Sequence, residues 1–344
     1  MFGAFVSYLV AFGGLLDLVW RVIINDTDVY VYAVIGITWV VIYPLSLLKN
    51  LSALRYTSLF GVICSLYLGV LIMIEYFVLC DGDERDLSQK SIHSCFWSKH
   101  FNLPKHAYFN YNDMWSFIKN LLVCFPLFIF ACSAQQFMLT IYAELTNNIR
   151  ARMQKVLQRS SYVILFLYAC ASVFGYLTFL DGVCGNILLN DYKKSPGAVL
   201  AAIAISISMI LAEPIITFSW RAIFVDLIWK TRQQDLSIIK YVLITTVFVF
   251  LGMLVALSVA NVEIVFGLLG ATTYPLCGFI LPAILFHNIA PISDFPIRYK
   301  VVVFQAVAVA LVSISSLIYQ MYGIINPSTD WNKCNNVQDI KTPT

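Results

Sequence analysis

Glu213 and Pro214 stand side by side inside an otherwise apolar run, Gly197 to Ser219. A carboxylate near the middle of a bilayer costs at least a few kcal/mol, so it is expected to face a cavity, a partner or an ion path. Proline removes a helical hydrogen bond in the same turn, which predicts a broken helix with a carbonyl free to bind a ligand. Two interpretations stay open. Glu213 either bonds to a neighbouring helix or reaches the interface beside a kink, or it lines an ion path.

The composition places these residues in a membrane. Hydrophobic residues make up 60% of the 344, charged residues 12%, and the mean hydropathy is +0.80, whereas soluble proteins are about 45–50% apolar. A helical span needs roughly 20 apolar residues. The sequence therefore predicts an all-α membrane protein with about nine spans. These run Phe2 to Ile24, Val31 to Leu48, Thr57 to Leu79, Trp115 to Leu139, Ser160 to Leu180, Gly197 to Ser219, Ile239 to Ala260, Ile264 to Phe286 and Val301 to Ile325.

The basic residues predict the orientation of these spans. They follow the second, fourth, sixth and eighth spans, and cytoplasmic loops are the ones enriched in Lys and Arg. The N-terminus is therefore expected inside and the tail, residues 326–344, outside or luminal. The basic residues are Lys49, Arg55, Arg150, Arg152, Lys155, Arg159, Arg221, Lys230, Arg232, Lys240, Arg298 and Lys300.

The one long loop, residues 81–113, is polar and is predicted on the outer side. Cys80 and Cys95 flank its first half, and an oxidising compartment would permit a disulfide between them. Cys184 and Cys334, also predicted outside, keep other pairings open.

Three of the four histidines lie in this loop, at positions 93, 100 and 106. They lack the spacing and the matching cysteine pair of a zinc site. They are interpreted as solvated residues, and no metal site is expected.

Several segments resemble the amino acid/auxin permease family. The stretch from Tyr43 to Leu51, followed by Leu54 to Ser58, is most similar to the solute carrier 38 branch, whose fourth span ends in a Pro-Leu-Ser-Leu-Leu run before a basic turn and Tyr-Thr-Ser. Three further matches occur in the same order along the chain. They are Ile141-Tyr142-Ala143-Glu144-Leu145, Phe174-Gly175-Tyr176-Leu177-Thr178-Phe179 and Gly278-Phe279-Ile280-Leu281-Pro282-Ala283.

The resemblance implies a LeuT-like bundle of eleven spans, built from two inverted five-helix repeats and one added helix. Residues 1–325 would form the transporter domain, with the first span here corresponding to the family's third. The family's first two spans then have no counterpart, so the chain is expected to be a fragment or else a shortened paralogue. In LeuT-like transporters the first and sixth spans are the broken helices that hold substrate and ion.

By this resemblance, the fourth span here, Trp115 to Leu139, is the remaining broken helix. Pro126 lies inside it and precedes a small, polar patch, and half-helix ends of this kind can coordinate the charged groups of an amino acid. Gln135 could instead serve as packing between helices, together with Gln136. The predicted substrate-binding residues are Phe130, Ala131, Cys132, Ser133, Ala134 and Gln135.

The sixth span resembles the family's eighth, where sodium-coupled members place a threonine that helps to bind sodium. That threonine is absent here, whereas Glu213 could carry a proton, because a buried carboxyl group can exchange one near physiological pH. The predicted ion-coupling residues are Glu213, Ser206 and Ser208. The coupling ion is H⁺ or Na⁺, with the proton favoured.

The leading interpretation is a secondary active transporter of amino acids, of neutral ones by the resemblance. An amino acid sensor and a non-transporting shortened paralogue are the alternatives. No enzyme motif is found, and no cofactor or nucleic acid is expected. The partners are the amino acid and the lipid bilayer, a monomer is expected, and the membrane is the plasma membrane or an endolysosomal or vacuolar one.

Overall fold

The computed structural model describes residues 1–24, 30–48, 55–81, 114–133, 138, 142, 149–179, 186–189, 195–231, 235–259, 262–289 and 296–325. All regular structure in these ranges is helical, and they contain no strand. The prediction of an all-α protein is confirmed for this part of the chain.

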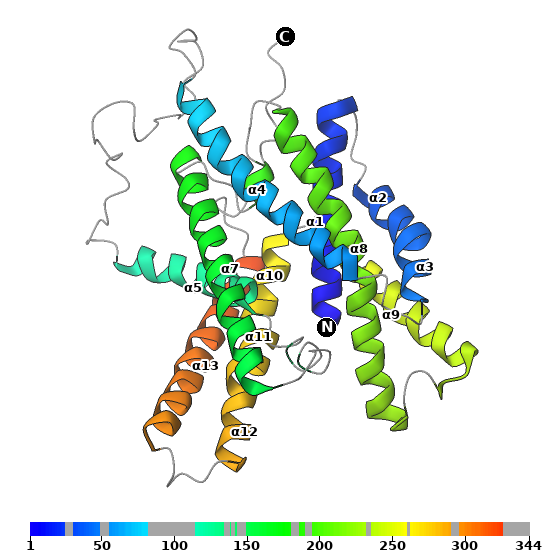
Figure 1. Cartoon of the computed structure of the whole chain (residues 1–344), viewed down its shortest axis with the longest axis vertical. Coiled ribbons are helices and arrows are strands. Elements are labelled where there is room, and N and C mark those ends of the chain that lie inside the picture. The colour runs from blue at the N-terminus through cyan, green and yellow to red at the C-terminus, as the bar shows by residue number, and fades with distance from the viewer. Residues whose placement is uncertain are drawn as a thin grey trace. The chain divides into compact units, whose positions relative to one another are not determined.

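The helices follow the predicted apolar runs, because backbone groups in a bilayer must bond within their own segment. In chain order the elements are α1 (Phe2–Ile24), α2 (Tyr30–Ile37), a π-helical turn (Thr38–Ile42), α3 (Tyr43–Ser46), α4 (Arg55–Asp81), α5 (Met114–Cys132), α7 (Arg150–Phe179), a 3-10 turn (Ile187–Leu189), α8 (Pro196–Trp229), α9 (Ile238–Ser258), α10 (Val262–Ala271), α11 (Thr273–Pro275), a second π-helical turn (Leu276–Ile280), α12 (Leu281–Ile289) and α13 (Pro296–Ile325) (Figure 1).

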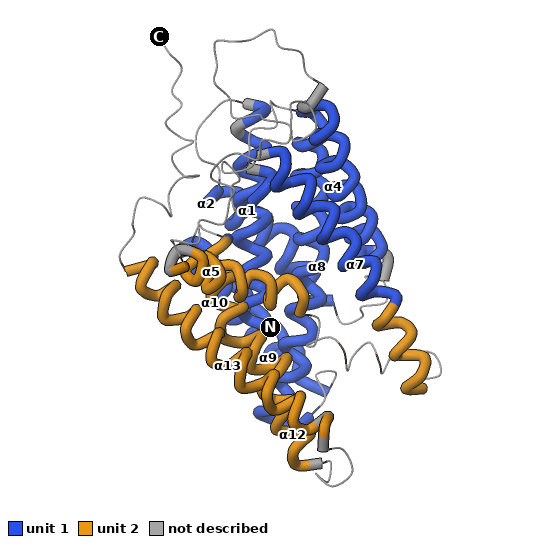
Figure 2. The backbone as a smooth tube through the Cα atoms, turned by 90° about the vertical axis from the view of Figure 1, so that its left-hand side faces the viewer, with its two compact units in different colours: residues 1–105, 159–262 blue, residues 106–158, 263–344 orange. Residues whose placement is uncertain are grey.

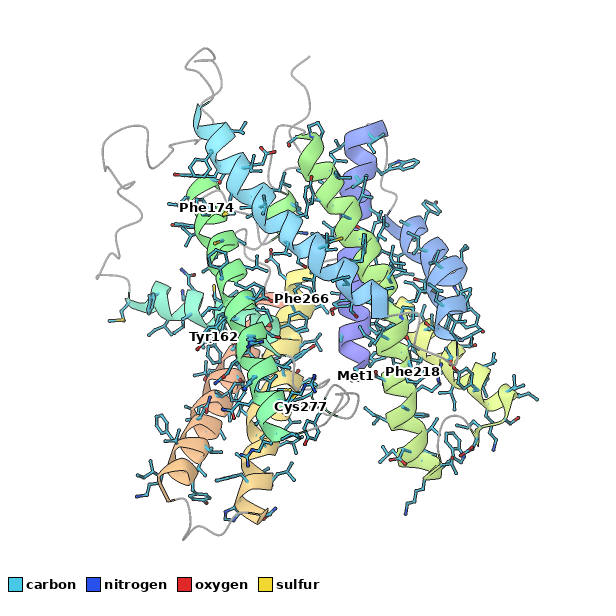
Figure 3. The ribbon with its side chains drawn as sticks, viewed as in Figure 1. Met1, Tyr162, Phe174, Phe218, Phe266 and Cys277 are labelled. Carbon is cyan, nitrogen blue, oxygen red and sulfur yellow. The ribbon has the colours of Figure 1, made fainter. Side chains whose placement is uncertain are left out.

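Seven helical segments of the described chain are long and apolar enough to cross a membrane. Two shorter apolar segments, Tyr30–Ser46 and Phe117–Cys132, coincide with the predicted second and fourth spans. A multi-pass membrane protein is thus confirmed, while the total of nine spans depends on these two shorter segments. Exposed side chains agree with a lipid environment: Tyr162 of α7, labelled in Figure 3, is 72% exposed.

Two helices extend beyond their predicted limits. α7 begins at Arg150, ten residues before the predicted start at Ser160, and α8 continues to Trp229, ten residues past Ser219. The apolar run marks only the part of a helix that lies in lipid, and backbone hydrogen bonding continues into the charged ends. Several basic residues predicted in loops therefore lie on helices.

One compact unit combines residues 1–105 and 159–262 and contains α1–α4, most of α7, α8 and α9 (Figure 2). Within it α1 packs against α8 and α9, and α4 packs against α8. Small residues allow such close approach. At Gly252 of α9, a Cβ would lie 2.5 Å from the ring of Phe5. One core cluster of this unit consists of Leu15, Val19, Leu71, Leu188, Ala201 and Ala202.

The other unit combines residues 106–158 and 263–344 and contains α5, the first turns of α7, almost all of α10, and α11–α13 (Figure 2). α5 packs against α13. α10 meets α5 backbone to backbone, because a Cβ at Gly270 would overlap the carbonyl oxygen of Pro126. This contact fixes the α5 proline against a helix that is far away in sequence.

Candidate functional site

Glu213 lies within α8, and its side chain is completely buried. Neither carboxyl oxygen has a hydrogen-bond partner among the described residues. Such groups are rare in proteins, since a buried polar atom without a partner loses its water without compensation. Glu213 therefore does not bond to a neighbouring helix among the described residues, as one alternative to an ion path required.

Pro214 does not break α8. The helix runs without interruption from Pro196 to Trp229, so the predicted break at this position is wrong. Membrane helices tolerate proline, although its missing N–H leaves the Ile210 carbonyl without its usual helical donor. One turn later, the hydroxyl of Thr217 donates to the Glu213 carbonyl at 3.1 Å. The backbone around Glu213 is therefore held within α8.

Ser206 and Ser208 do not form one cluster with Glu213. Ser206 is completely buried, seven residues before Glu213, and so lies on the same face of α8 about 10 Å away along the axis. Its hydroxyl donates to the Ala202 carbonyl at 2.7 Å. Ser208 points elsewhere, because its Oγ lies 2.8 Å from the position that a Cβ on Gly61 of α4 would occupy. An ion at Glu213 would thus have Ser206, and not Ser208, on its side of the helix.

Thr38 is a buried polar residue on a segment that packs against α8, and no sequence pattern marked it. It is fully buried in the first π-helical turn, and its hydroxyl has no hydrogen-bond partner among the described residues. Ser46 lies eight residues after Thr38, and Arg221 lies eight residues after Glu213. The Ser46 carbonyl accepts a 2.9 Å hydrogen bond from Arg221, so these two later positions are in contact. Both segments run in the same direction (Figure 1), and α8 packs against both the π-helical turn and α3. Thr38 therefore lies near the depth of Glu213.

Arg221 was predicted in a cytoplasmic loop, and the structure corrects this. It lies in α8 and is fully buried. Its guanidinium group donates to the Ser46 carbonyl and, at 2.8 Å, to Thr245 Oγ1 of α9. A guanidinium group tolerates burial when acceptors and aromatic faces surround it. Arg221 thus joins α3, α8 and α9 instead of marking a loop.

The predicted substrate segment coincides with the end of α5. The helix passes through Pro126 and ends at Cys132, so the interruption begins at Ser133 and not at the proline. The Ser133 hydroxyl donates to the Ile129 carbonyl at 2.5 Å, while Ala131 and Cys132 are exposed. The last C=O groups of a helix have no donor within it and can accept a hydrogen bond from a polar ligand. Ala134 and Gln135 lie outside the described residues.

The carbonyl released by Pro126 is already occupied. Proline at 126 removes the helical donor of the Leu122 carbonyl, and the hydroxyl of Ser316 in α13 donates to that carbonyl instead. The Leu122 carbonyl is therefore not available to another ligand in this structure.

An aromatic cluster lies beside the end of α5. The ring of Phe130 stacks on Phe266 of α10, with centroids 4.3 Å apart, and meets Tyr274 edge to face at 5.0 Å; Figure 3 labels Phe266. α10 ends at Ala271, the short α11 holds Tyr274 and Pro275, and a π-helical turn follows it. In unit 2 the last turn of α5 is thus in aromatic contact with α10 and with α11.

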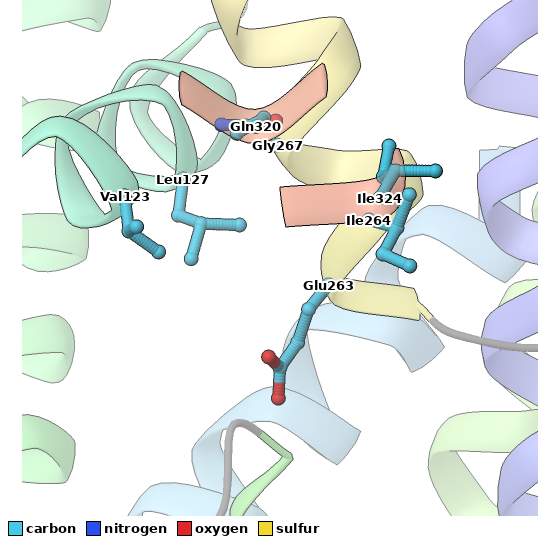
Figure 4. A pocket seen from close by; sticks show the side chains of 7 residues that line it. All are labelled: Val123, Leu127, Glu263, Ile264, Gly267, Gln320 and Ile324. Atoms are coloured by element: carbon cyan, nitrogen blue, oxygen red, sulfur yellow. The ribbon is translucent and has the colours of Figure 1, made fainter. Parts of the chain in front are cut away.

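A narrow cavity of about 10 Å³ lies between α5, α10 and α13 (Figure 4), close to the space that one water molecule needs. Glu263 lies in the first turn of α10 and lines this cavity. The other lining residues are Val123, Leu127, Ile264, Gly267, Gln320 and Ile324.

Glu75 is a second buried carboxyl group of unit 1, and its carboxylate accepts a hydrogen bond from the hydroxyl of Ser195. Ser195 precedes α8, so this contact joins the C-terminal part of α4 to the start of α8. The proposed Cys80–Cys95 pair and the three loop histidines depend on positions outside the described residues.

The chain matches one protein-family model, described as "Transmembrane amino acid transporter protein", over residues 1–326. No solved structure matches it.

Proposed function

We propose that this chain, which belongs to the transmembrane amino acid transporter family, is a secondary active transporter of neutral amino acids. In this proposal, proton binding at Glu213 drives uptake. The supporting observation is the complete burial of a carboxyl group that has no hydrogen-bond partner among the described residues. An isolated carboxylate is costly in such a place, whereas the protonated form is tolerated. Movement of a proton on and off Glu213 would therefore favour different conformations.

Thr38 supports this role for Glu213. Its hydroxyl can donate to a carboxylate or accept from a protonated carboxyl group. It lies near the depth of Glu213 on a segment that packs against α8. Sodium coupling has weaker support, because Ser206 already donates to its own helix and Ser208 lies against α4.

The substrate is proposed to bind at the end of α5, from Phe130 to Gln135. Exposed small residues, Ala131 and Cys132, let a ligand approach the backbone, and the helix end offers the polar groups that an amino acid needs. Phe130, Phe266 and Tyr274 would supply an apolar wall for an uncharged side chain.

Alternating access would arise from movement of one helical bundle against another.

The test is uptake of a labelled neutral amino acid into proteoliposomes that contain the full chain, with and without an inward proton gradient. We expect the gradient to stimulate uptake in wild type but not in Glu213→Gln, which keeps the size of the side chain and cannot ionise. Thr178→Val is the matched control, because its hydroxyl bonds only to the Phe174 carbonyl of its own helix, at 2.7 Å.

Uptake that requires sodium and ignores the proton gradient would reject proton coupling. Specific binding of the amino acid without any uptake would indicate the sensor instead.

A further inference from the structure

A hydroxyl group of another helix bonds to the backbone of α5 one turn before its internal proline. Proline at position 126 cannot donate to the Leu122 carbonyl, and Ser316 of α13 supplies the missing donor. Ser316 is completely buried, so water does not compete for this bond. In lipid the carbonyl would otherwise stay unsatisfied.

Gln320 extends this contact by one helical turn. It is almost fully buried, and its Nε2 donates to Ser316 Oγ at 3.4 Å. The Ser316 hydroxyl can accept this bond while it donates its own proton to the Leu122 carbonyl. The three groups therefore form a chain that runs in one direction, from the Gln320 amide through Ser316 to the backbone of α5.

α10 leaves room for this junction at two glycines three residues apart. A Cβ at Gly267 would lie 2.7 Å from Gln320 Oε1, and a Cβ at Gly270 would meet the Pro126 carbonyl oxygen. Figure 4 shows Gln320 beside Gly267. α10 thus packs closely against both the Gln320 side chain and the backbone of Pro126.

The helix that these contacts hold is the one whose end carries the proposed substrate site. Pro126 lies four residues before Phe130, which is about one helical turn, so a change in the direction of the helix at Pro126 would shift Phe130 and the end of α5. Misplacement of binding groups by about 1 Å is enough to weaken binding or turnover strongly.

We infer that Ser316, assisted by Gln320, is a positioning residue of α13 that replaces the hydrogen bond lost at Pro126 and thereby sets the direction of the substrate-binding end of α5. The inference rests on the proposed function of that end. It assigns to α13 a part in substrate binding although α13 contributes no group to the substrate site.

The first test compares uptake kinetics of Ser316→Ala and Ser315→Ala in the full chain. Ser315 is the matched control, because it is exposed and its hydroxyl donates to the Leu311 carbonyl of its own helix at 2.8 Å. We expect KM of Ser316→Ala to rise by about tenfold, with a smaller change in kcat, and Ser315→Ala to match wild type. Ser316→Thr keeps the donor and should recover part of the loss.

A double-mutant cycle with Pro126→Ala separates positioning from general damage. Alanine at 126 restores the N–H that bonds to the Leu122 carbonyl, so Ser316→Ala should matter much less in that background. An equal effect of Ser316→Ala in both backgrounds would overturn the inference.

Amide hydrogen exchange of residues 127–132 provides a readout that does not need transport. Ser316→Ala should speed exchange there by about tenfold in the proline background and much less in the Pro126→Ala background. If the cycle shows this coupling in exchange while wild type takes up no amino acid, the positioning role stands and the proposed transport function falls. If wild type takes up the amino acid and neither readout shows coupling, the transport function stands and the positioning role falls.

Discussion

The guanidinium group of Arg221 stacks on the ring of Tyr241, with Cζ 3.9 Å from the ring centroid. The Tyr241 hydroxyl in turn donates to the carbonyls of Leu47 and Leu48, at 3.4 and 3.3 Å. Arg221 itself bonds to the Ser46 carbonyl. These carbonyls follow or end α3, where a helix carries partial negative charge. A buried cation and an aromatic ring on two other helices thus cap the end of α3.

Arg221→Met should destabilise the protein through this cap. The change leaves the Ser46 carbonyl and Thr245 without their charged donor, and hydrogen bonds to charged groups contribute about 1.5–3 kcal/mol each. We expect a clear fall in thermal stability of the detergent-solubilised chain, with at most partial recovery in Arg221→Lys because lysine cannot stack in the same way. Arg159→Met, at an exposed position of α7, should show little change. Equal stability of all these variants would contradict the capping role.

Gly270→Ala should disrupt unit 2. The added methyl group would overlap the Pro126 carbonyl oxygen, which belongs to a backbone that cannot move aside cheaply. Overpacking typically costs about 1–3 kcal/mol, and a clash with backbone belongs at the upper end. Gly14→Ala is the control, since a Cβ there meets nothing within 4 Å and alanine favours helix. Thermal unfolding of both variants measures the difference, and similar melting temperatures would argue against the close approach of α10 and α5.

Glu213→Leu should make the protein more stable while it removes proton coupling. Replacing buried ionisable groups with apolar ones is neutral or stabilising by about 1–4 kcal/mol, and functional residues often reduce stability. Thermal unfolding near neutral pH should show a higher midpoint than wild type. A large loss of stability would mean that Glu213 holds the fold together through a partner.

Thr38→Val should shift the pH dependence of uptake without a large loss of stability. Valine keeps the shape of threonine and removes only a hydroxyl that has no partner among the described residues. If that hydroxyl serves Glu213, the pH profile of proton-driven uptake should move, and in a Glu213→Gln background Thr38→Val should have no further effect on it. An unchanged profile would separate Thr38 from the ion site.

Gln135→Ala should raise KM for the amino acid, since its amide would bond to the charged groups of the substrate. Competition between labelled and unlabelled substrate measures this in proteoliposomes. Ser172→Ala provides the comparison, because Ser172 is exposed and bonds to the Ala169 carbonyl of its own helix at 3.1 Å. Intact uptake in Gln135→Ala would support a packing role for Gln135.

The apolar runs determined the class of this protein and most of its helices. α1 occupies the predicted range, Phe2 to Ile24, because lipid forces the backbone of an apolar run to bond to itself. The position of Glu213-Pro214 inside an apolar run also marked a carboxyl group that is completely buried in the fold. An apolar run and a charged residue within it are local patterns, so they can be read from a single sequence.

Tertiary contacts decided what the polar residues do. Because α8 continues past its apolar run, Arg221 is a buried helical residue and not a loop residue. α8 also continues through Pro214, where the local preference of proline predicted a break. Likewise, the Leu122 carbonyl received its donor from Ser316, 194 residues away. A hydrogen bond between helices depends on which helix faces meet in the fold. The periodicity of one helix in the sequence does not show which helix packs against it.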